Sequence, residues 1–298
     1  MKSRHLLCVA LLACPLSAWA GTPIDQTRAL NADGRVSIEN LKGSVQVRTW
    51  DRAEVHIGGT LGDGVKRLQI QGSESSVRIE VDYPDDNGWF GKGRSEPSEL
   101  IVTVPAKAEV DVDVVSADVD VEGVAGRRLA IDSVSGRVKA KGKPARAELE
   151  SVSGEIEATL ESAELDVSSV SGSLRVTGTS SGEIALETVS GSIDLEAGTI
   201  KRLRIESVSG SAEAQLQALA PGGRIDGETL SGRLTVSLPA TTSASVNIST
   251  FSGAIRSTVG EVKREGYGPG ASLETRLGDG NGKIELESFS GSVRLDLR

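Results

Sequence analysis

The sequence predicts an all-β protein that winds as a parallel β-solenoid (β-helix) with rungs of about 18–22 residues. Three observations predict this fold. Segments of the form Ser/Thr-x-Ser-Gly recur at a nearly fixed spacing, apolar and polar residues alternate on both sides of each segment, and helix signals are almost absent. A period near 20 residues is typical of solenoids, and a period of two is typical of strands.

The first predicted element is a secretory signal peptide at residues 1–20. The positive segment KSRH (2–5) precedes an apolar run (6–16), and AWA (18–20) forms a small-x-small cleavage site. The run is too short to span a membrane. In an alternative interpretation, LLAC (11–14) is a bacterial lipobox in which Cys14 carries a lipid. In both cases we expect an exported protein in the periplasm or at the cell surface, without a transmembrane segment after signal removal.

The composition excludes several kinds of site. Both cysteines, Cys8 and Cys14, lie in the signal peptide, so the mature chain would have no thiol for a disulfide or a metal. The formal net charge is −9, and removal of Lys2 and Arg4 makes it −11. A surface of this charge repels phosphate backbones, so we expect no nucleic acid partner. We also expect no catalytic residue, no cofactor and no metal site.

Residues 21–105 are predicted to be a β-rich but less regular N-terminal part of the solenoid. Six segments alternate like strands, with turn residues between them: 36–38, 45–47, 55–57, 68–70, 77–81 and 100–104. Two longer interruptions, 83–97 and 263–282, hold glycine, proline and scarce aromatic residues. We interpret both as surface loops.

Residues 106–298 are predicted to be the SVSG-repeat solenoid, with a loop insertion near 263–282. The glycines of the repeats are Gly136, Gly154, Gly172, Gly191, Gly210, Gly232, Gly253 and Gly291. Their spacings are 18, 18, 19, 19, 22, 21 and 38 residues. Because the last spacing equals two periods of 19, we expect that one rung has lost its motif. VVSA (114–117) and NLKG (40–43) are predicted to be degenerate copies.

The alternation changes parity at each repeat. In AELESVSGEIEATL (147–160), Ala147 and Leu149 share a face before the motif, whereas Ile156 and Ala158 share it afterwards. A straight strand cannot change parity, so the chain must bend at Ser-Val-Ser-Gly. Glycine supplies the positive φ or the close approach that a bend requires, and small hydroxylated side chains can bond to neighbouring backbone. The motif therefore recurs because each rung turns the same corner above the last.

Stacking of the corners predicts two rows of charge. The third residues after the glycines form a ladder whose first four charges alternate in sign: Lys139, Glu157, Arg175, Asp194, Glu213, Thr235 and Arg256. The residues before the motifs form an acidic column: Asp132, Glu150, Ser168, Glu187, Glu206, Glu228, Ser249 and Glu287. We expect the ladder to set register. We interpret the column as a solvated face that could also attract cations or basic partners.

The second motif position changes from Val in the early repeats to Leu230, Phe251 and Phe289 in the last three. We expect these larger side chains to cover apolar surface toward the C-terminal end, where a solenoid requires a cap.

Nearly all of residues 30–298 resembles the DUF4097-type β-strand repeat family, exported bacterial proteins also called putative adhesins. The segments that carry the resemblance are NLKGSVQVRTWDRAEV (40–55), LIVTVPAKAEVDVDVVSADVDVEG (100–123), the SVSG-type repeats and GDGNGKIELESFSGSVRLDL (278–297). The resemblance implies a β-solenoid of the cell envelope without established catalytic residues.

These observations favour a non-catalytic module that binds or scaffolds at the cell envelope. Its expected partner is an envelope protein or a glycan, and self-association is left open. The preferred contact is loop 83–97, where Trp89 and Phe90 are adjacent and Tyr83 is nearby, because aromatic residues on loops often anchor partners. In the competing interpretation these aromatic side chains fold back over the solenoid.

Two alternatives remain. A carbohydrate-active enzyme of the β-helix type requires a special constellation of carboxylates, but the carboxylates here recur at repeat positions. His56, which stands between Val55 and Ile57, is expected to be an outward-facing strand residue rather than part of a catalytic triad. Calcium binding is suggested by DDNG (85–88) and DGNG (279–282), although neither matches a full calcium-binding motif.

Overall fold

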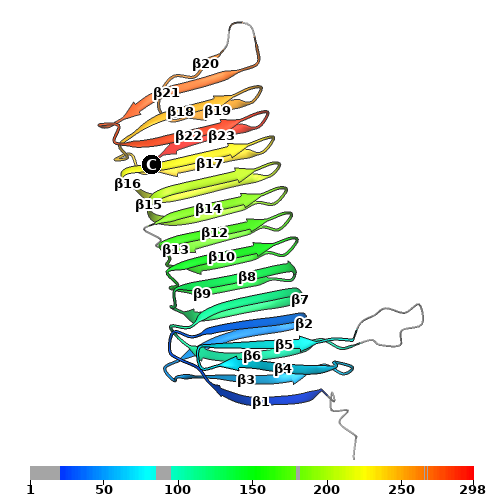
Figure 1. The fold of residues 1–298 in the computed structure, drawn as a ribbon. Coiled ribbons are helices and arrows are strands. Elements are labelled where there is room, and N and C mark those ends of the chain that lie inside the picture. The colour runs from blue at the N-terminus through cyan, green and yellow to red at the C-terminus, as the bar shows by residue number, and fades with distance from the viewer. Residues whose placement is uncertain (1–20, 85–94, 179–181, 265, 267) are drawn as a thin grey trace, which may run out of the picture.

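A computed structural model describes residues 21–84, 95–178, 182–264, 266 and 268–298, which form one stack of β-strands (Figure 1). The predicted signal peptide, Cys14, Trp89, Phe90 and the DDNG segment lie outside the described residues. Within the described residues every regular element is a strand, and no helix has the length and apolar character needed to cross a bilayer.

Two walls of strands build the repeat region, one before and one after each corner. The first wall contains β8 (Arg128–Ser135), β10 (Arg146–Ser151), β12 (Glu164–Ser169) and β14 (Glu183–Thr188). The second contains β9 (Val138–Gly142), β11 (Ile156–Leu160) and β13 (Leu174–Gly178), while β15 (Ile193–Ser207) and β16 (Ser211–Thr229) run from the second wall into the next first wall. Strands within a wall pair in parallel, with Glu150 between Asp132 and Ser168. The predicted parallel β-solenoid is therefore confirmed.

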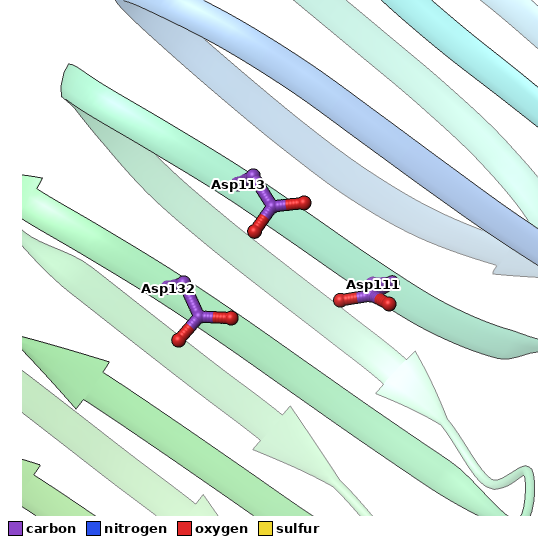
Figure 2. A group of neighbouring side chains, drawn as sticks. All are labelled: Asp111, Asp113 and Asp132. Atoms are coloured by element: carbon purple, nitrogen blue, oxygen red, sulfur yellow. The ribbon is translucent and has the colours of Figure 1, made fainter.

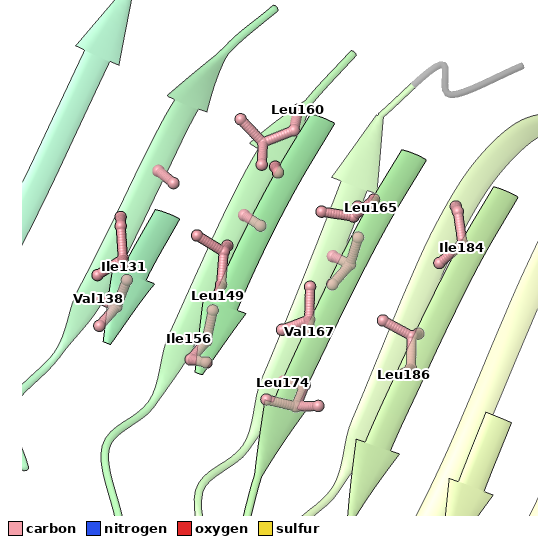
Figure 3. Close-up of a cluster of buried hydrophobic side chains, with 14 of the residues drawn as sticks. Ile131, Val138, Leu149, Ile156, Leu160, Leu165, Val167, Leu174, Ile184 and Leu186 are labelled. Atoms are coloured by element: carbon pink, nitrogen blue, oxygen red, sulfur yellow. The ribbon is translucent and has the colours of Figure 1, made fainter. Parts of the chain in front are cut away.

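The core lies between the two walls (Figure 3). Leu149 before the corner and Ile156 after it are both fully buried, as are Val167 and Leu174 in the next rung. The expected change of parity at the corner is confirmed, because the inward positions are odd in β10 and even in β11. Each rung thus adds one layer of aliphatic side chains to a continuous core, which the hydrophobic effect stabilises.

Antiparallel strands cover the N-terminal end. They are β1 (Thr22–Ala29), β3 (Glu54–Leu61), β4 (Arg67–Ser73), β5 (Ser76–Asp82) and β6 (Ser98–Pro105), with the antiparallel pairs β1–β3, β3–β6 and β4–β5. β2 (Arg35–Trp50) pairs in parallel with β5 and β6 and also with β7 (Glu109–Val124), and β2 and β7 pass through the corner without a break. Gly43 pairs with Ala117, so NLKG and VVSA are corner copies, as predicted.

The C-terminal end departs from the expected order of rungs. β22 (Gly282–Ser288) lies between β16 and β18 (Ala244–Thr250), and β23 (Ser292–Leu297) lies between β17 (Arg233–Leu238) and β19 (Ala254–Ser257). The last rung therefore inserts between two earlier rungs, as Figure 1 shows in red between yellow and orange strands. The expectation of a rung that lost its motif is wrong.

The segment between these rungs explains the long spacing. It contains β20 (Lys263–Arg264) and β21 (Ala271–Leu277), and β21 pairs antiparallel with all of β18. The interpretation of 263–282 as a loop is thus wrong for residues 271–277. Buried Leu273 and Leu277 follow the alternation of a strand, but the glycines and proline around them obscured it. β21 covers an edge that would otherwise expose unpaired backbone groups.

Candidate binding groove beside the corner

The corner is held by close contact between glycine backbones. A Cβ atom on Gly154 would overlap the carbonyl oxygen of Gly136, and a Cβ atom on Gly172 would overlap that of Gly154. Positive φ occurs only at Gly43 (115°) and Gly136 (122°) among the corner glycines. Of the two roles expected for glycine, close approach is therefore the one that operates along most of the stack.

The hydroxyl groups of the motif make two kinds of hydrogen bond. In five motifs the first hydroxyl accepts from the glycine N–H of its own rung, as Ser151 Oγ does from Gly154 at 2.8 Å. The second serine donates to a carbonyl of the adjacent rung, as Ser153 Oγ does to Val134 at 3.1 Å. Equivalent second-serine bonds recur at Ser171, Ser190, Ser209, Ser231, Ser252 and Ser290. The corner is therefore fixed by backbone and hydroxyl groups.

The second motif residues point outward and form an exposed apolar ridge. In spatial order its members are Leu41, Val115, Val134, Val152, Val170, Val189, Val208, Leu230, Phe289 and Phe251. Their exposed fractions range from 42% to 61%. Phe251 and Phe289 stack with ring centroids 4.9 Å apart, yet Phe251 is the most exposed member. The expectation that these rings cover the C-terminal end is wrong, since they extend the ridge on the outside.

The acidic column runs parallel to the ridge and leaves a shallow groove between them. On each first-wall strand the column residue, which is acidic on most rungs, precedes the ridge residue by two positions, so both point outward from the same face. The buried first hydroxyls of the motifs lie between the two rows and form the floor. The groove extends from Asp113 to the Phe251–Phe289 pair and has a volume of about 1060 Å³. It joins an apolar wall to an anionic wall along most of the repeat region.

Most carboxylates of this column have no cationic partner among the described residues. Glu206 forms an ion pair with Arg204. The groove has six other carboxylates, five from the column and Asp113 at its N-terminal end, and no ion pair of the described chain includes any of them. They are Asp113, Asp132, Glu150, Glu187, Glu228 and Glu287. The anionic wall therefore keeps most of its charge uncompensated.

The local environment makes three of these carboxylates harder to ionise. Loss of hydration on the strand side raises the pKa of Asp113, Asp132 and Glu150, although their side chains reach solvent. Repulsion from neighbouring carboxylates adds to the rise in each pKa. A cation in the groove would relieve this repulsion.

The second wall carries the predicted charge ladder, and its first two members form an ion pair. Glu157 lies in register between Lys139 and Arg175, and the Lys139 Nζ is 3.2 Å from the Glu157 carboxylate. The predicted register is confirmed for this part of the ladder. Near the C-terminus Arg294 lies between Thr235 and Arg256, because the last rung is inserted there.

Three aspartates gather where the groove begins (Figure 2). Asp111 and Asp113 project from β7 and Asp132 from β8, with one carboxylate oxygen of each within 4.8 Å of the others. Arg128 approaches Asp111 at 3.6 Å and partly neutralises the group. Carboxylate oxygens suit Ca²⁺ or Mg²⁺, so this trio is the part of the described chain best able to hold such an ion. The sequence interpretation named Asp132 but did not bring the trio together.

The structure places Tyr83, another predicted site residue, away from the groove. Tyr83 is buried, and its hydroxyl contacts Asn40, Lys42 and Ser98 within 3.0 Å, so it packs inside the N-terminal end. Its two companion aromatics in loop 83–97 lie outside the described residues, and a contact there stays a prediction.

His56 and the DGNG segment also have local roles. His56 points outward from β3 as expected, and its Nε2 is 2.9 Å from Asp25. Gly278 and Gly280 adopt positive φ in the turn before β22, where the guanidinium of Arg276 donates to the Asp279 backbone carbonyl. This arrangement is an ordinary glycine turn.

Sequence reasoning missed the ridge although its signal was present. Alternation places the second motif residue outward, and that residue is Val, Leu or Phe in every SVSG-type repeat. An apolar side chain at an outward position of each rung predicts a continuous exposed stripe.

This architecture also occurs in known proteins. No curated protein matches. Solved structures that match include a "putative lipid binding protein" from Parabacteroides distasonis (12% identity, TM-score 0.55, 92% of this chain and 97% of that chain). They also include a "putative adhesin" from Parabacteroides merdae (10% identity, TM-score 0.54, 92% and 96%) and another from P. distasonis (9%, 0.52, 93% and 98%). At these identities the similarity shows the fold alone. The model of the Toastrack DUF4097 family matches residues 34–296, and the chain therefore belongs to that family.

Proposed function

We propose that this protein is a non-catalytic binding module of the bacterial cell envelope, and that the groove beside the corner is its binding surface. The observation that carries the proposal is the apolar ridge, which stays exposed along the corner next to a column of mostly unpaired carboxylates. A continuous exposed apolar stripe of this length is unusual on a soluble surface and typical of an interaction site.

Three further observations support the proposed location and the proposed binding role. Residues 1–20 read as a signal peptide, which would deliver the protein to the periplasm or the cell surface. Two structural relatives are described as adhesins and one as a lipid-binding protein, which are binding activities rather than reactions. A repeated surface also suits an adhesin-like or scaffold role, because equivalent contacts recur along its length.

The test is saturable binding of the purified, labelled protein to envelope vesicles of its source bacterium. The variant Val170→Ser/Val189→Ser/Val208→Ser reduces the apolar character of the central ridge and should lower affinity at least tenfold. A matched control changes three outward residues of the second wall, as Thr159→Ser/Thr177→Ser/Thr235→Ser. Equal binding by the ridge variant and the wild type would refute the groove as the binding surface.

The aromatic loop needs its own variant because it lies outside the described residues. We keep the proposal that Trp89 and Phe90 contribute to partner contact. Replacement of both by Ala should weaken vesicle binding if they do, and unchanged binding would rule them out.

A further inference from the structure

From the geometry of the groove, and resting on the proposed binding function, we infer the class of partner: a polypeptide helix that carries an apolar stripe and, beside it, a row of Lys or Arg side chains. The helix would lie along the groove, with its apolar stripe on the ridge and its cationic row on the acidic column. Helix-in-groove recognition is a recurring mode of peptide binding.

Charge complementarity is the first argument. Elsewhere many carboxylates of the described chain have a cationic partner, as in Lys139–Glu157, Arg146–Glu164 and Arg224–Glu285. Beside the ridge most carboxylates of the acidic column lack one, including Glu187 and Glu228, whereas Glu206 between them pairs with Arg204. A partner that supplies the missing cations gains attraction on each rung, and ridge contact excludes water from the same surface.

Shape is the second argument. Rungs repeat about every 4.8 Å along the groove. One turn of an α-helix advances about 5.4 Å, so a helix drifts by about 0.6 Å per rung and by only about half a rung after four turns. An extended segment presents same-face side chains about every 6.7 Å, so by the second rung its side chains are out of register with the rungs. A helix of about four turns therefore matches the groove best.

The two rows also have the right separation. Acidic and ridge residues on one strand are two positions apart, which is about 6.7 Å. An α-helix with its side chains is about 10–12 Å across, which is wider than this separation. One helix can thus contact both walls at once.

Other occupants fit less well. An anionic lipid surface would meet the acidic column with like charge, and a second copy would bring another chain of formal net charge −9. A glycan would find aromatic rings only at the Phe251–Phe289 end of the described ridge. The cationic helix is the occupant that uses both walls of the groove.

The probe is an amidated, dye-labelled 18-residue helical peptide with one Leu stripe and one adjacent Lys stripe, measured by fluorescence anisotropy with the purified protein. We expect saturable binding at low salt that weakens steeply in 0.5 M NaCl. A peptide with Glu in place of each Lys should bind at least a hundredfold more weakly.

Two protein variants locate the peptide. Glu187→Gln/Glu206→Gln/Glu228→Gln should lose at least tenfold in affinity and most of the salt dependence. The control Glu157→Gln/Glu196→Gln/Glu213→Gln makes the same change of net charge on the second wall and should bind like the wild type. Circular dichroism and thermal unfolding verify that each variant keeps its fold.

Several outcomes would overturn the inference. They are equal loss of affinity in both triple variants, equal binding of the Lys and Glu peptides, no peptide binding at all, or preferential binding to phosphatidylglycerol vesicles. Concentration-dependent dimerisation that the ridge variant abolishes would assign the groove to a second copy. The proposed function is tested independently of this inference, because ridge-dependent binding to vesicles can persist even when the helical peptide does not bind.

Discussion

Two rows of outward-facing side chains run along the same solenoid, and they use charge in opposite ways. Over the first four rungs of the second-wall ladder, opposite charges alternate, and Lys139 and Glu157 form an ion pair. Beside the corner, most carboxylates of the acidic column have no cationic partner among the described residues, and they adjoin an apolar ridge. The walls share strand spacing and core, so the difference lies in the side chains alone.

The corner and the second wall are stabilised by different interactions. The corner is fixed by glycine contacts and by hydrogen bonds of its hydroxyl groups, so the ridge and the acidic column are not needed to hold it. The second wall lacks this motif, and its outward charges help to keep rungs in register. Inward changes at the corner should therefore be costly, outward changes on the second wall mildly costly, and outward changes at the corner neutral or favourable.

The largest effect is expected for Gly172→Ala. The new Cβ would overlap the Gly154 carbonyl oxygen, so the rungs must separate and lose neighbouring hydrogen bonds. We expect a loss of about 3 kcal/mol in the free energy of unfolding, measured by urea denaturation. Gly266→Ala is the control, because nothing lies within 4 Å of a Cβ there. Similar stability of the two variants would show that close glycine contact does not hold the corner.

A smaller effect is expected for the buried hydroxyls. Ser151→Ala removes the acceptor of the Gly154 N–H, a bond of 2.8 Å, and should cost about 1–2 kcal/mol in unfolding free energy. Ser207 is equally buried, but its Oγ has no hydrogen-bond partner, so Ser207→Ala should cost much less. Thermal unfolding of both variants tests this, and equal losses would mean that packing rather than the hydrogen bond matters.

Much of this corner could be predicted from the sequence, since the information is local and repeated. The motif glycines, the change of parity between Leu149 and Ile156, and the register of Glu157 with Lys139 all follow from one short pattern. Repetition averages out the ambiguity of any single strand. For the same reason, the parallel solenoid could be inferred before any coordinates.

The order of the last rungs could not be predicted, because it depends on which edge each strand pairs with. β22 and β18 carry the same motif, and either could stack on β16. The spacing of 38 residues between Gly253 and Gly291 fits a lost rung and an inserted rung equally well. The groove was missed for a related reason: the acidic and apolar rows were each visible in the sequence, but their separation across the corner is a property of the fold.

The third prediction concerns the ladder. Lys139→Glu replaces an attraction to Glu157 by repulsion, and it also places like charge opposite Asp120. The free energy of unfolding should fall by about 1 kcal/mol at low salt. Because the pair is exposed, 0.5 M NaCl should remove most of the difference. A loss that is independent of salt would point to packing of the lysine stem instead.

The smallest effect has the opposite sign and comes from the acidic column. Loss of hydration, followed by repulsion from Asp111 and Glu148, raises the pKa of Asp132 in the folded state, while Arg128 partly offsets the rise. Between the unfolded pKa, about 3.9, and the raised folded pKa, the native state binds more protons. Its stability should therefore increase as pH falls from 7 toward about 4.

Asp132→Asn should thus stabilise the protein slightly at pH 7, within about 0.5 kcal/mol, and flatten its pH dependence. Glu109 provides the contrast, because hydrogen bonding from Arg35 lowers its pKa. Its contribution is present above the unfolded pKa and is lost as pH falls through the folded pKa, so Glu109→Gln should destabilise at pH 7. Urea denaturation at pH 5 and 7 measures both signs. A loss of stability in Asp132→Asn at pH 7 would mean that the acidic column supports the fold, and the functional contrast between the two rows would disappear.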